Sequence, residues 1–260
     1  MADRLKSEPF HGLCALVTGG GSGIGRSITR ELAVCGATVI AVGRRNEPLT
    51  ETAAGIGSAS FRIKPHAADI TIEEDILNLA ARIQKEFGRL DILVHSAGSI
   101  AIAEVERASL ADLDTQYKTN VRGPYALTQS LLSLLRQAQG QIVFINSSVG
   151  LKSRAGVIQY AATKHALRAI ADGIREELNP DGVRVASVFV GRTASPMQMS
   201  IHELEGVEYC PEKLLQPEDV AAVVVNVLQL ARTAEVTDIS IRPLKKHDAV
   251  RKSRTESVQQ

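Results

Sequence analysis

Short apolar runs alternate with longer stretches of helical periodicity along most of the chain. The runs short enough to be buried strands cover residues 13–17, 38–42, 60–65, 91–94, 141–145, 182–189 and 236–241. Between them, apolar residues recur at intervals of three and four, which indicates amphipathic helices. Strands that alternate with helices favour a parallel sheet covered on both faces. We therefore expect an α/β fold: one doubly wound domain over residues 1–244, with a seven-stranded parallel sheet flanked by helices.

Four further segments carry expectations of their own. Residues 157–178 predict one helix, and residues 110–138 predict another that bends near 120–124, because Pro124 removes a backbone hydrogen bond. Residues 190–210 mix apolar and polar positions, and we interpret them as a mobile flap over a pocket. From residue 245 the chain is polar without periodicity, which is typical of a disordered tail.

The first strand leads into a glycine-rich turn that a helical pattern follows. This order is the context of a dinucleotide site, because glycines let a pyrophosphate approach the backbone and the helix N-terminus offers free N–H groups. We therefore expect the fold to be Rossmann-type. The spacing is G-x-x-x-G-x-G, not the commoner G-x-G-x-x-G, so a glycine turn without a ligand is the alternative. The candidate cofactor contacts here are Thr18, Gly19, Ser22, Gly23, Ile24 and Gly25.

The second strand ends in a pair of arginines. An acidic side chain at this place would accept hydrogen bonds from the adenosine ribose and select NAD, but Arg44 and Arg45 stand there instead. A guanidinium suits a ribose phosphate in charge and in hydrogen-bond geometry. The pair therefore predicts that NADP is preferred over NAD, with an exposed basic turn as the alternative.

Asp69 and Ile70 follow the third strand and are further candidate cofactor contacts. Asp69 would lie near the adenine at the strand end, or it would cap the next helix. Thr71 with Glu74 fits a capping box at the same place.

The fourth strand is followed by small residues, Ser96, Ala97 and Gly98, which would let a cofactor pass over the strand ends. These three residues are therefore candidate cofactor contacts as well. We interpret His95, just before them, as a packed structural histidine.

Tyr160 and Lys164 lie four residues apart within the helix expected over 157–178, so their side chains share one face. A fixed cation beside a phenol favours the phenolate and lowers its pKa, which suits the phenol to acid–base catalysis. Such a pair is also common on ordinary helices, so it decides little alone. Asn120 at the expected bend, and Ser147 at the end of the fifth strand, are further polar candidates.

Composition narrows the function classes. The chain has 260 residues, is 44% hydrophobic and 23% charged, and carries a net charge of +1, which argues against nucleic acid as a partner. Its three cysteines form neither a metal-type pair nor a disulfide framework. No apolar run approaches membrane-spanning length, and residues 1–10 lack an apolar signal core. We expect a cytoplasmic protein without a metal or a membrane partner.

The order of these residues along the chain matches that of a known family. Over residues 13–243 the chain resembles the single-domain short-chain dehydrogenase/reductases, through the glycine turn, Ala97-Gly98, Asn120, Ser147, Tyr160 and Lys164. The resemblance implies the roles of the site residues. Tyr160 is the general acid and base, Lys164 binds the nicotinamide ribose and lowers the pKa of Tyr160, Ser147 binds the substrate oxygen, and Asn120 holds a relay water. Tyr160, Lys164, Gly191 and Thr193 would also contact the cofactor.

The chain departs from the family pattern at three places. His95 and Ser96 replace two asparagines after the fourth strand, Val190 replaces a proline after the sixth, and Ser22 stands where NADP-type members often carry a basic residue. We expect an NADP-dependent enzyme that interconverts a carbonyl and a secondary alcohol on a small-molecule substrate. A regulator that binds NADPH without turnover is the alternative, and a related lyase or epimerase is disfavoured by the compact length. The family resemblance implies a homotetramer or homodimer.

Overall fold

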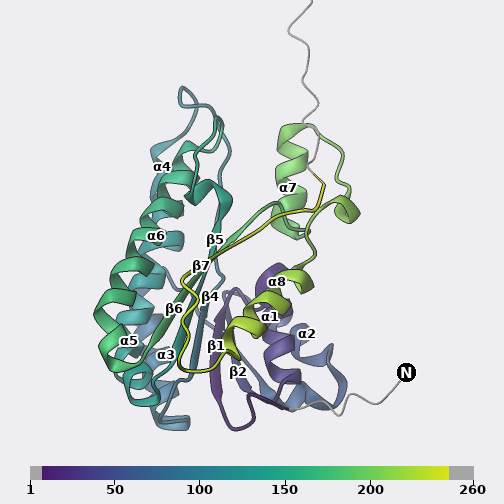
Figure 1. The fold of residues 1–260 in the computed structure, drawn as a ribbon. Coiled ribbons are helices and arrows are strands. Elements are labelled where there is room, and N and C mark those ends of the chain that lie inside the picture. The colour runs from purple at the N-terminus through teal and green to yellow at the C-terminus, as the bar shows by residue number, and fades with distance from the viewer. Residues whose placement is uncertain (1–7, 246–260) are drawn as a thin grey trace, which may run out of the picture.

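The computed structural model describes residues 8–245 and contains one fully parallel sheet. Its strands are ordered β3-β2-β1-β4-β5-β6-β7. Figure 1 shows the sheet between its helices. The predicted seven-stranded, doubly wound α/β fold is therefore confirmed. The strand bounds are β1 Cys14–Thr18, β2 Thr38–Gly43, β3 Ile63–Ala67, β4 Ile92–His95, β5 Gln141–Ser147, β6 Arg184–Val190 and β7 Asp238–Ile241.

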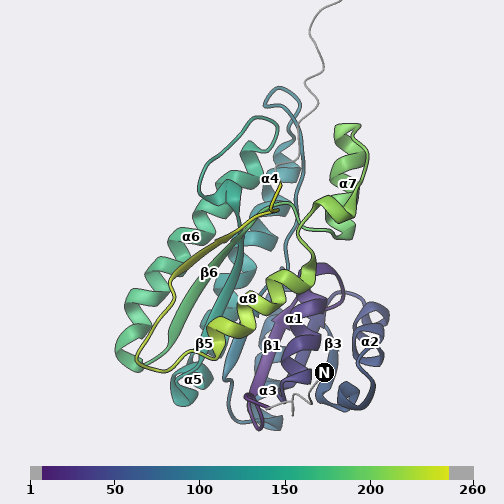
Figure 2. The same cartoon turned by 45° about the vertical axis from the view of Figure 1, so that its right-hand side comes forward.

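The helices form a layer on each face of this sheet. In Figures 1 and 2, α1, α2 and α8 cover one face and α3, α4, α5 and α6 cover the other, while α7 stands beyond the strand ends. No helix within residues 8–245 is both long and apolar enough to cross a bilayer. The helix bounds are α1 Gly23–Val34, α2 Asn46–Ala54, α3 Glu73–Glu86, α4 Leu110–Tyr117, α5 Gly123–Ala138, α6 Ile158–Leu178, α7 Pro196–Glu205 and α8 Pro217–Leu228.

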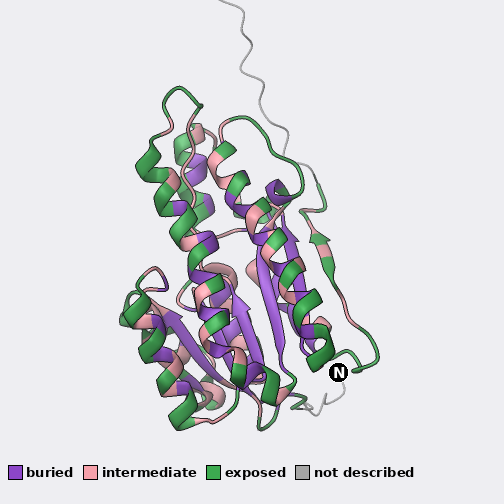
Figure 3. Ribbon diagram, turned by 90° about the vertical axis from the view of Figure 1, so that its left-hand side faces the viewer, coloured by how far each residue is buried: buried purple, intermediate pink, exposed green. Residues whose placement is uncertain are grey.

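The central strands are apolar throughout because both of their faces are covered. All five residues of β1 are buried. Ala15 and Val17 pack in the core under α1 and α8, whereas Cys14 and Leu16 pack on the opposite face under α3 and α5. Figure 3 shows the same division, with buried strands and helices that are buried along one side. This two-sided burial explains why short continuous apolar runs identify the strands.

The strand order reverses beside β1, which pairs with β2 on one side and with β4 on the other. Thr18, the last residue of β1, lies opposite Val42 and His95 in these two ladders. Ligands of doubly wound sheets bind outside the carboxyl ends of the strands at such a reversal. The topology therefore brings the candidate residues that follow β1, β2, β4 and β5 to one edge.

Two local predictions at the third strand are wrong. Residues 57–62 form a 3-10 turn, and β3 begins only at Ile63, so the strand expected over 60–65 is shifted. Pro65 lies inside β3, which an edge strand tolerates because one side needs no N–H donor. The capping box is also absent, since α3 has Ile72 at its N-cap and Thr71 Oγ1 donates to Asp69.

The bend expected in residues 110–138 is confirmed. A single π-helical turn, Lys118–Arg122, separates α4 from α5, and Pro124 stands in the first turn of α5. The backbone stays helical through this turn, so the missing N–H of Pro124 removes a hydrogen bond at the predicted place. The flap expected over 190–210 contains the helix α7. Ser195 is its N-cap, and Pro196 is its first residue. Residues 246–260, which make up nearly all of the expected disordered tail, lie outside the described residues.

Candidate active site

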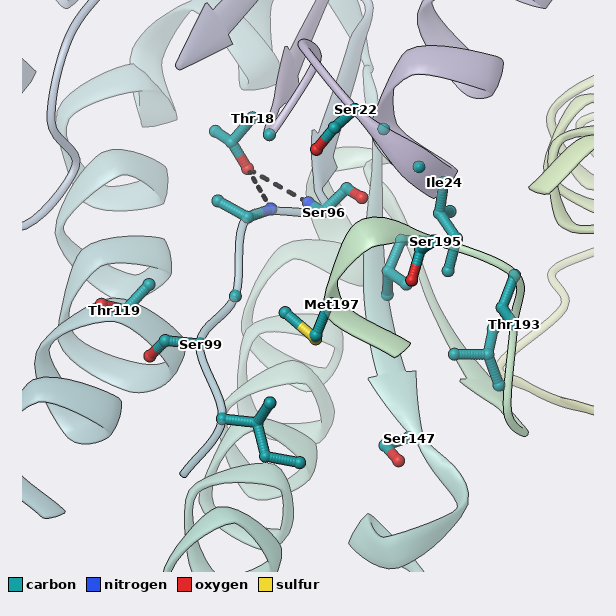
Figure 4. Close-up of a pocket in the computed structure, with 18 of the residues that line it drawn as sticks. Thr18, Ser22, Ile24, Ser96, Ser99, Thr119, Ser147, Thr193, Ser195 and Met197 are labelled. Carbon is teal, nitrogen blue, oxygen red and sulfur yellow. Dashed lines mark hydrogen bonds between the residues drawn. The ribbon is translucent and has the colours of Figure 1, made fainter. Parts of the chain in front are cut away.

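A cleft of about 950 Å³ opens at the carboxyl ends of the strands. Every candidate cofactor residue predicted from the sequence lines it, as does Ser147, whereas Asn120 does not. Figure 4 shows part of this lining, with Thr18 and Ser22 at one side and Ser147 at the other. The predicted residues that line the cleft are Thr18, Gly19, Ser22, Gly23, Ile24, Gly25, Arg44, Arg45, Asp69, Ile70, Ser96, Ala97, Gly98, Ser147, Tyr160, Lys164, Gly191 and Thr193.

The glycine turn is folded too tightly for other side chains at two positions. A Cβ atom on Gly25 would lie 2.2 Å from the carbonyl oxygen of Gly19. Gly19 has a φ of +69°, and a Cβ there would lie 2.9 Å from the backbone nitrogen of Ala97. The turn therefore packs backbone against backbone, which leaves its outer side open to a ligand.

Thr18 connects this turn to the segment after β4. Its Oγ1 accepts hydrogen bonds from the backbone N–H groups of Ser96 and Ala97, each at 3.1 Å (Figure 4). Ser22, at the N-cap of α1, makes no side-chain cap. The first N–H groups of α1 thus point toward the cleft without a side-chain acceptor, the arrangement that suits an anion such as a pyrophosphate.

The two arginines after β2 are exposed at the cleft. Neither Arg44 nor Arg45 makes a side-chain hydrogen bond or an ion pair with any residue in 8–245. By contrast, Arg26 on α1 is engaged, since it donates to the carbonyl of Gly21 at 3.0 and 2.5 Å and to Glu51 at 3.2 Å. Arg44 and Arg45 are therefore available to a phosphate, while Arg26 fixes the glycine turn.

Asp69 does not cap α3, whose N-cap is Ile72 without a side-chain cap hydrogen bond, so the helix-cap alternative is wrong. Asp69 lines the cleft, and its Oδ1 accepts hydrogen bonds from the N–H and the hydroxyl of Thr71 at 2.9 and 2.8 Å. Its own N–H donates to Asp75 at 2.8 Å. Asp69 therefore shapes the turn before α3 while it forms part of the cleft wall.

Tyr160 and Lys164 lie on the same side of α6, beside the end of β5. Lys164 is buried, and its Nζ donates to the carbonyl of Ile145 at 3.0 Å. The same Nζ lies 5.7 Å from the centre of the Tyr160 ring. Ser147, two residues further along β5, faces the Tyr160 hydroxyl and acts to lower its pKa. The three candidate side chains thus share one wall of the cleft.

The pKa of Tyr160 differs from the expectation that Lys164 lowers it. Removal of the hydroxyl from water raises the pKa of Tyr160 to about 12, against the smaller opposing effect of the Ser147 side chain. Burial lowers the pKa of Lys164 to about 8. In the protein alone, burial is therefore the dominant influence on the acidity of the phenol.

Asn120 acts as a clamp behind the wall of the cleft. Its Oδ1 accepts from the N–H of Ser99 at 2.8 Å, and its Nδ2 donates to the carbonyl of Ser99 at 2.8 Å and to Thr163 Oγ1 at 3.0 Å. The side chain is buried, and both of its N–H donors are used by these bonds. It joins the segment after β4 to α6, one residue before Lys164.

His95, where the family pattern has an asparagine, is buried between β4 and α5. The Thr128 hydroxyl donates to the carbonyl of Pro124 at 2.9 Å, so it must accept from His95 Nε2 at 2.8 Å. Nδ1 is then an acceptor, and it has no partner within the described residues. Burial lowers the pKa of His95 to about 3, so the ring is neutral at physiological pH.

Several residues of the cleft lie outside the candidate motifs, some of them in the segment 190–210 expected to cover a pocket. Met197, Gln198 and Ile201 of α7 line the cleft, and a Cβ on Gly23 would lie 3.1 Å from that of Ser195. In Figure 4 the start of α7 lies between the glycine turn and Ser147. The dipeptide Ser195-Pro196, an N-cap followed by proline, is a helix-start signal that could have found α7. Lys152, Arg154 and Arg192, which also line the cleft, have no such signal.

The cleft fits a nicotinamide dinucleotide better than a metal. The open glycine turn and the uncapped start of α1 suit a pyrophosphate, and the unpaired arginines suit a further phosphate. Within residues 8–245, no group of three or more histidine, cysteine or carboxylate side chains could hold a metal ion.

The chain belongs to the short chain dehydrogenase family, whose pattern it matches over residues 13–206. An uncharacterized oxidoreductase of Staphylococcus epidermidis is 31% identical over 231 residues, which cover 88% of this chain and 96% of that protein. An uncharacterized oxidoreductase of Staphylococcus aureus is 30% identical with the same coverage. The resemblance seen in the sequence is therefore confirmed, and the chain is an oxidoreductase of this family.

Solved structures agree with this assignment. A short chain dehydrogenase from Shigella flexneri complexed with NADP superposes with a TM-score of 0.83 at 29% identity, covering 90% of this chain and 98% of that chain. A short chain dehydrogenase from Burkholderia cenocepacia in complex with NADP gives a TM-score of 0.79 at 30% identity, covering 90% and 97%. A metagenomic short-chain oxidoreductase in complex with NADP gives 0.79 at 28%, covering 92% and 100%.

Substitution by alanine should have opposite effects on stability at a crowded glycine of the glycine turn and at an open glycine of α6. Gly25→Ala should destabilise the protein by about 2 kcal/mol, the scale of overpacking, and weaken NADPH binding, because its Cβ meets the Gly19 carbonyl. Gly173→Ala, in the open middle of α6, should stabilise by about 1 kcal/mol and leave binding unchanged. Thermal unfolding and NADPH titration of both variants measure this. Wild-type binding by Gly25→Ala would contradict the tight turn.

Burial of His95 predicts a stability difference in acid. Between pH about 3 and its ordinary value of 6.5, the unfolded chain binds a proton that the folded protein does not. Stability should therefore rise with pH across this window and be lost as the pH falls, by up to about 1.4 kcal/mol per pH unit. Urea unfolding from pH 4 to 7 should show a flatter profile for His95→Gln than for wild type.

The control for this profile is His11→Gln, which removes an exposed histidine. It should keep the wild-type slope. A His95→Gln profile parallel to that of wild type would show that His95 is not held neutral by burial.

Proposed function

We propose that this protein is an NADP-dependent oxidoreductase that interconverts a carbonyl and a secondary alcohol by hydride transfer. The observation that carries the proposal is the shared wall formed by Ser147, Tyr160 and Lys164, which continues into the glycine turn within one cleft. A proton donor, a hydroxyl to bind oxygen and a cation thereby face the place where a dinucleotide fits. Ordinary structural roles do not require all three in one cleft.

Each side chain then has one task. The Tyr160 hydroxyl donates its proton to the carbonyl oxygen during reduction and takes one from the alcohol during oxidation. The Ser147 hydroxyl donates a hydrogen bond to the same oxygen and stabilises its developing charge. Lys164, with a pKa of about 8, is mostly charged at neutral pH and would hold the hydroxyls of the cofactor ribose. When bound, the cofactor supplies or accepts the hydride, and its oxidised ring carries a positive charge.

That positive charge bears on the raised pKa of Tyr160. A nearby cation favours the phenolate, so oxidised cofactor bound in this cleft would lower the pKa that burial raises. We also propose that the Asn120 backbone holds a water which links Lys164 to solvent, since both N–H donors of the Asn120 side chain are already used. Proton supply to Tyr160 would follow this route.

The preference for NADP over NAD rests on Arg44 and Arg45. Both are exposed at the cleft and without partners in the described chain, directly after β2. The NADP complexes of the Shigella and Burkholderia proteins support a nicotinamide cofactor and, more modestly, its phosphorylated form. The substrate would be a small molecule with a carbonyl or secondary hydroxyl group.

We propose that the protein assembles as a homodimer or homotetramer. Large apolar side chains are exposed on the helices beside the cleft, at Leu110, Tyr117, Tyr125 and Ile158, and burial against a second copy would remove them from water. A cytoplasmic location, expected from the sequence, stays a prediction.

Loss of the Tyr160 hydroxyl should abolish turnover and leave cofactor binding intact. Tyr160→Phe removes the proton donor but keeps the ring, so NADPH oxidation with a panel of ketones should fall by about 100-fold or more. Fluorescence titration should give NADPH affinity within about twofold of wild type, since no charge is lost. Retained turnover would remove Tyr160 from its role. NADPH binding by the wild type, without turnover of any carbonyl, would instead favour the regulator.

Loss of the Arg44 guanidinium should discriminate between the two cofactors. Arg44→Ala should weaken NADPH binding by about tenfold or more, the value of a charge-assisted hydrogen bond, with little effect on NADH. Arg232→Ala, exposed and outside the cleft, is the matched control and should change neither affinity. Equal losses for NADPH and NADH in Arg44→Ala would overturn the assignment of this arginine to the ribose phosphate.

A further inference from the structure

The end of the cleft near Ser147 is basic. Lys152 and Arg154 lie in the segment that joins Ser147 to the Tyr160 helix, and Arg192 follows β6; all three line the cleft. Among the described residues that line the cleft, Asp69 is the one acidic side chain, and it follows β3. No carboxylate of the lining therefore offsets these cations where a substrate would meet Ser147 and Tyr160.

These cations are separate from those assigned to the cofactor. Arg44 and Arg45 follow β2, whereas Lys152 and Arg154 follow β5, and the strand order places β1 and β4 between them. Three strand steps of about 4.8 Å separate the two ends by roughly 14 Å. The second basic group is thus not a duplicate site for the same phosphate.

The three cations differ in how far they are neutralised. Arg192 Nη2 lies 2.7 Å from each carboxylate oxygen of Glu205 at the end of α7, so this pair is closed. Arg154 lies 3.9 Å from the same carboxylate and has half of its side chain exposed, a geometry that contributes little. Lys152 is exposed and has no ion pair with any residue in 8–245. Arg154 is therefore only weakly paired, and Lys152 is unpaired within residues 8–245.

An apolar wall adjoins this basic end. Val149 and Val157 pack together with Ile100 beside Tyr160, and all three line the cleft. Met197 of α7 contributes a further apolar side chain, 40% exposed. The cleft thus offers an apolar surface next to the reacting groups, with the cations of Arg154 and Lys152 beyond it.

We propose that the substrate is an amphipathic keto acid, or the corresponding hydroxy acid, with an apolar chain between its carbonyl and its carboxylate. The carboxylate is bound by Arg154, assisted by Lys152, and Arg154 is the residue that determines specificity. In reduction, the carbonyl carbon receives the hydride of the reduced cofactor and the carbonyl oxygen receives the proton of Tyr160, while the carboxylate is unchanged. This substrate class rests on the proposed function.

The test compares charged and neutral forms of one substrate. The substrates are straight-chain keto acids with a methyl ketone at one end and a carboxylate at the other. Each acid and its methyl ester are assayed with NADPH, at several chain lengths. Wild type should turn over the best acid with a kcat/KM about tenfold above that of its ester at low salt, and the ratio should shrink in about 0.5 M NaCl. A ratio of one or below at every length would overturn the inference. A stronger preference for a matching phosphate monoester would overturn the carboxylate as the ligand.

Variants assign the preference to named residues. Arg154→Gln should lower the acid-to-ester ratio about fivefold through the KM of the acid, and Lys152→Gln should lower it by about twofold. Arg232→Gln, outside the cleft, is the matched control and should keep the wild-type ratio. An unchanged ratio in both cleft variants would contradict the assignment.

Turnover and binding measurements together separate a failure of this inference from a failure of the proposed function. Turnover of neutral ketones without preference for acids would overturn the substrate class alone. If no carbonyl is turned over, the proposed function fails, and calorimetry with octanoate and octanamide then tests the site. Tighter binding of octanoate that is lost in Arg154→Gln would sustain the anion site; equal binding of acid and amide would overturn it.

Discussion

The position of the Lys164 ammonium is the constraint on which the rest of the site depends. A buried charge needs a partner, and Lys164 finds it in the carbonyl of Ile145 on β5. Asn146 returns the contact by donating to the Lys164 carbonyl at 3.1 Å. A Cβ on Gly150 would lie 3.0 Å from that same carbonyl, so glycine is needed where the chain passes α6. The end of β5 and the start of α6 are thereby held together, which fixes Ser147 against Tyr160.

The parallel sheet places the other walls of the cleft beside this contact between β5 and α6. Its carboxyl ends bring the glycine turn, the arginines after β2 and the segment after β4 to one edge, although they are far apart in sequence. Thr18 and Asn120 then fix the segment after β4 from its two ends, through backbone N–H groups of Ala97 and Ser99. Helix α7 meets the glycine turn at Ser195 and the opposite rim through Arg192 and Glu205. The candidate cofactor and substrate residues therefore share one cleft.

The sequence predicts the fold well because two-sided burial makes the central strands apolar throughout, as in β1. It predicts less at the edge, where Pro65 and a 3-10 turn displace β3. The cofactor candidates line the cleft because strand ends meet wherever strands are parallel. Other features depend on tertiary contacts that no local pattern records: the clamp of Asn120 around Ser99, the convergence of Arg154 and Arg192 on Glu205, and the burial that raises the pKa of Tyr160. Ser195-Pro196 is different, since its helix signal was present and local.

The central claim is that burial keeps the Tyr160 phenol protonated until positive charge enters the cleft. The direct measurement is an ultraviolet difference titration of wild type against Tyr160→Phe, without and with saturating oxidised NADP. Without the cofactor, the Tyr160 signal should show no ionisation at about pH 10, where a free tyrosine is half ionised. With the cofactor, the phenolate should form at least about one pH unit lower than without it. The same titration midpoint in both conditions would contradict the account.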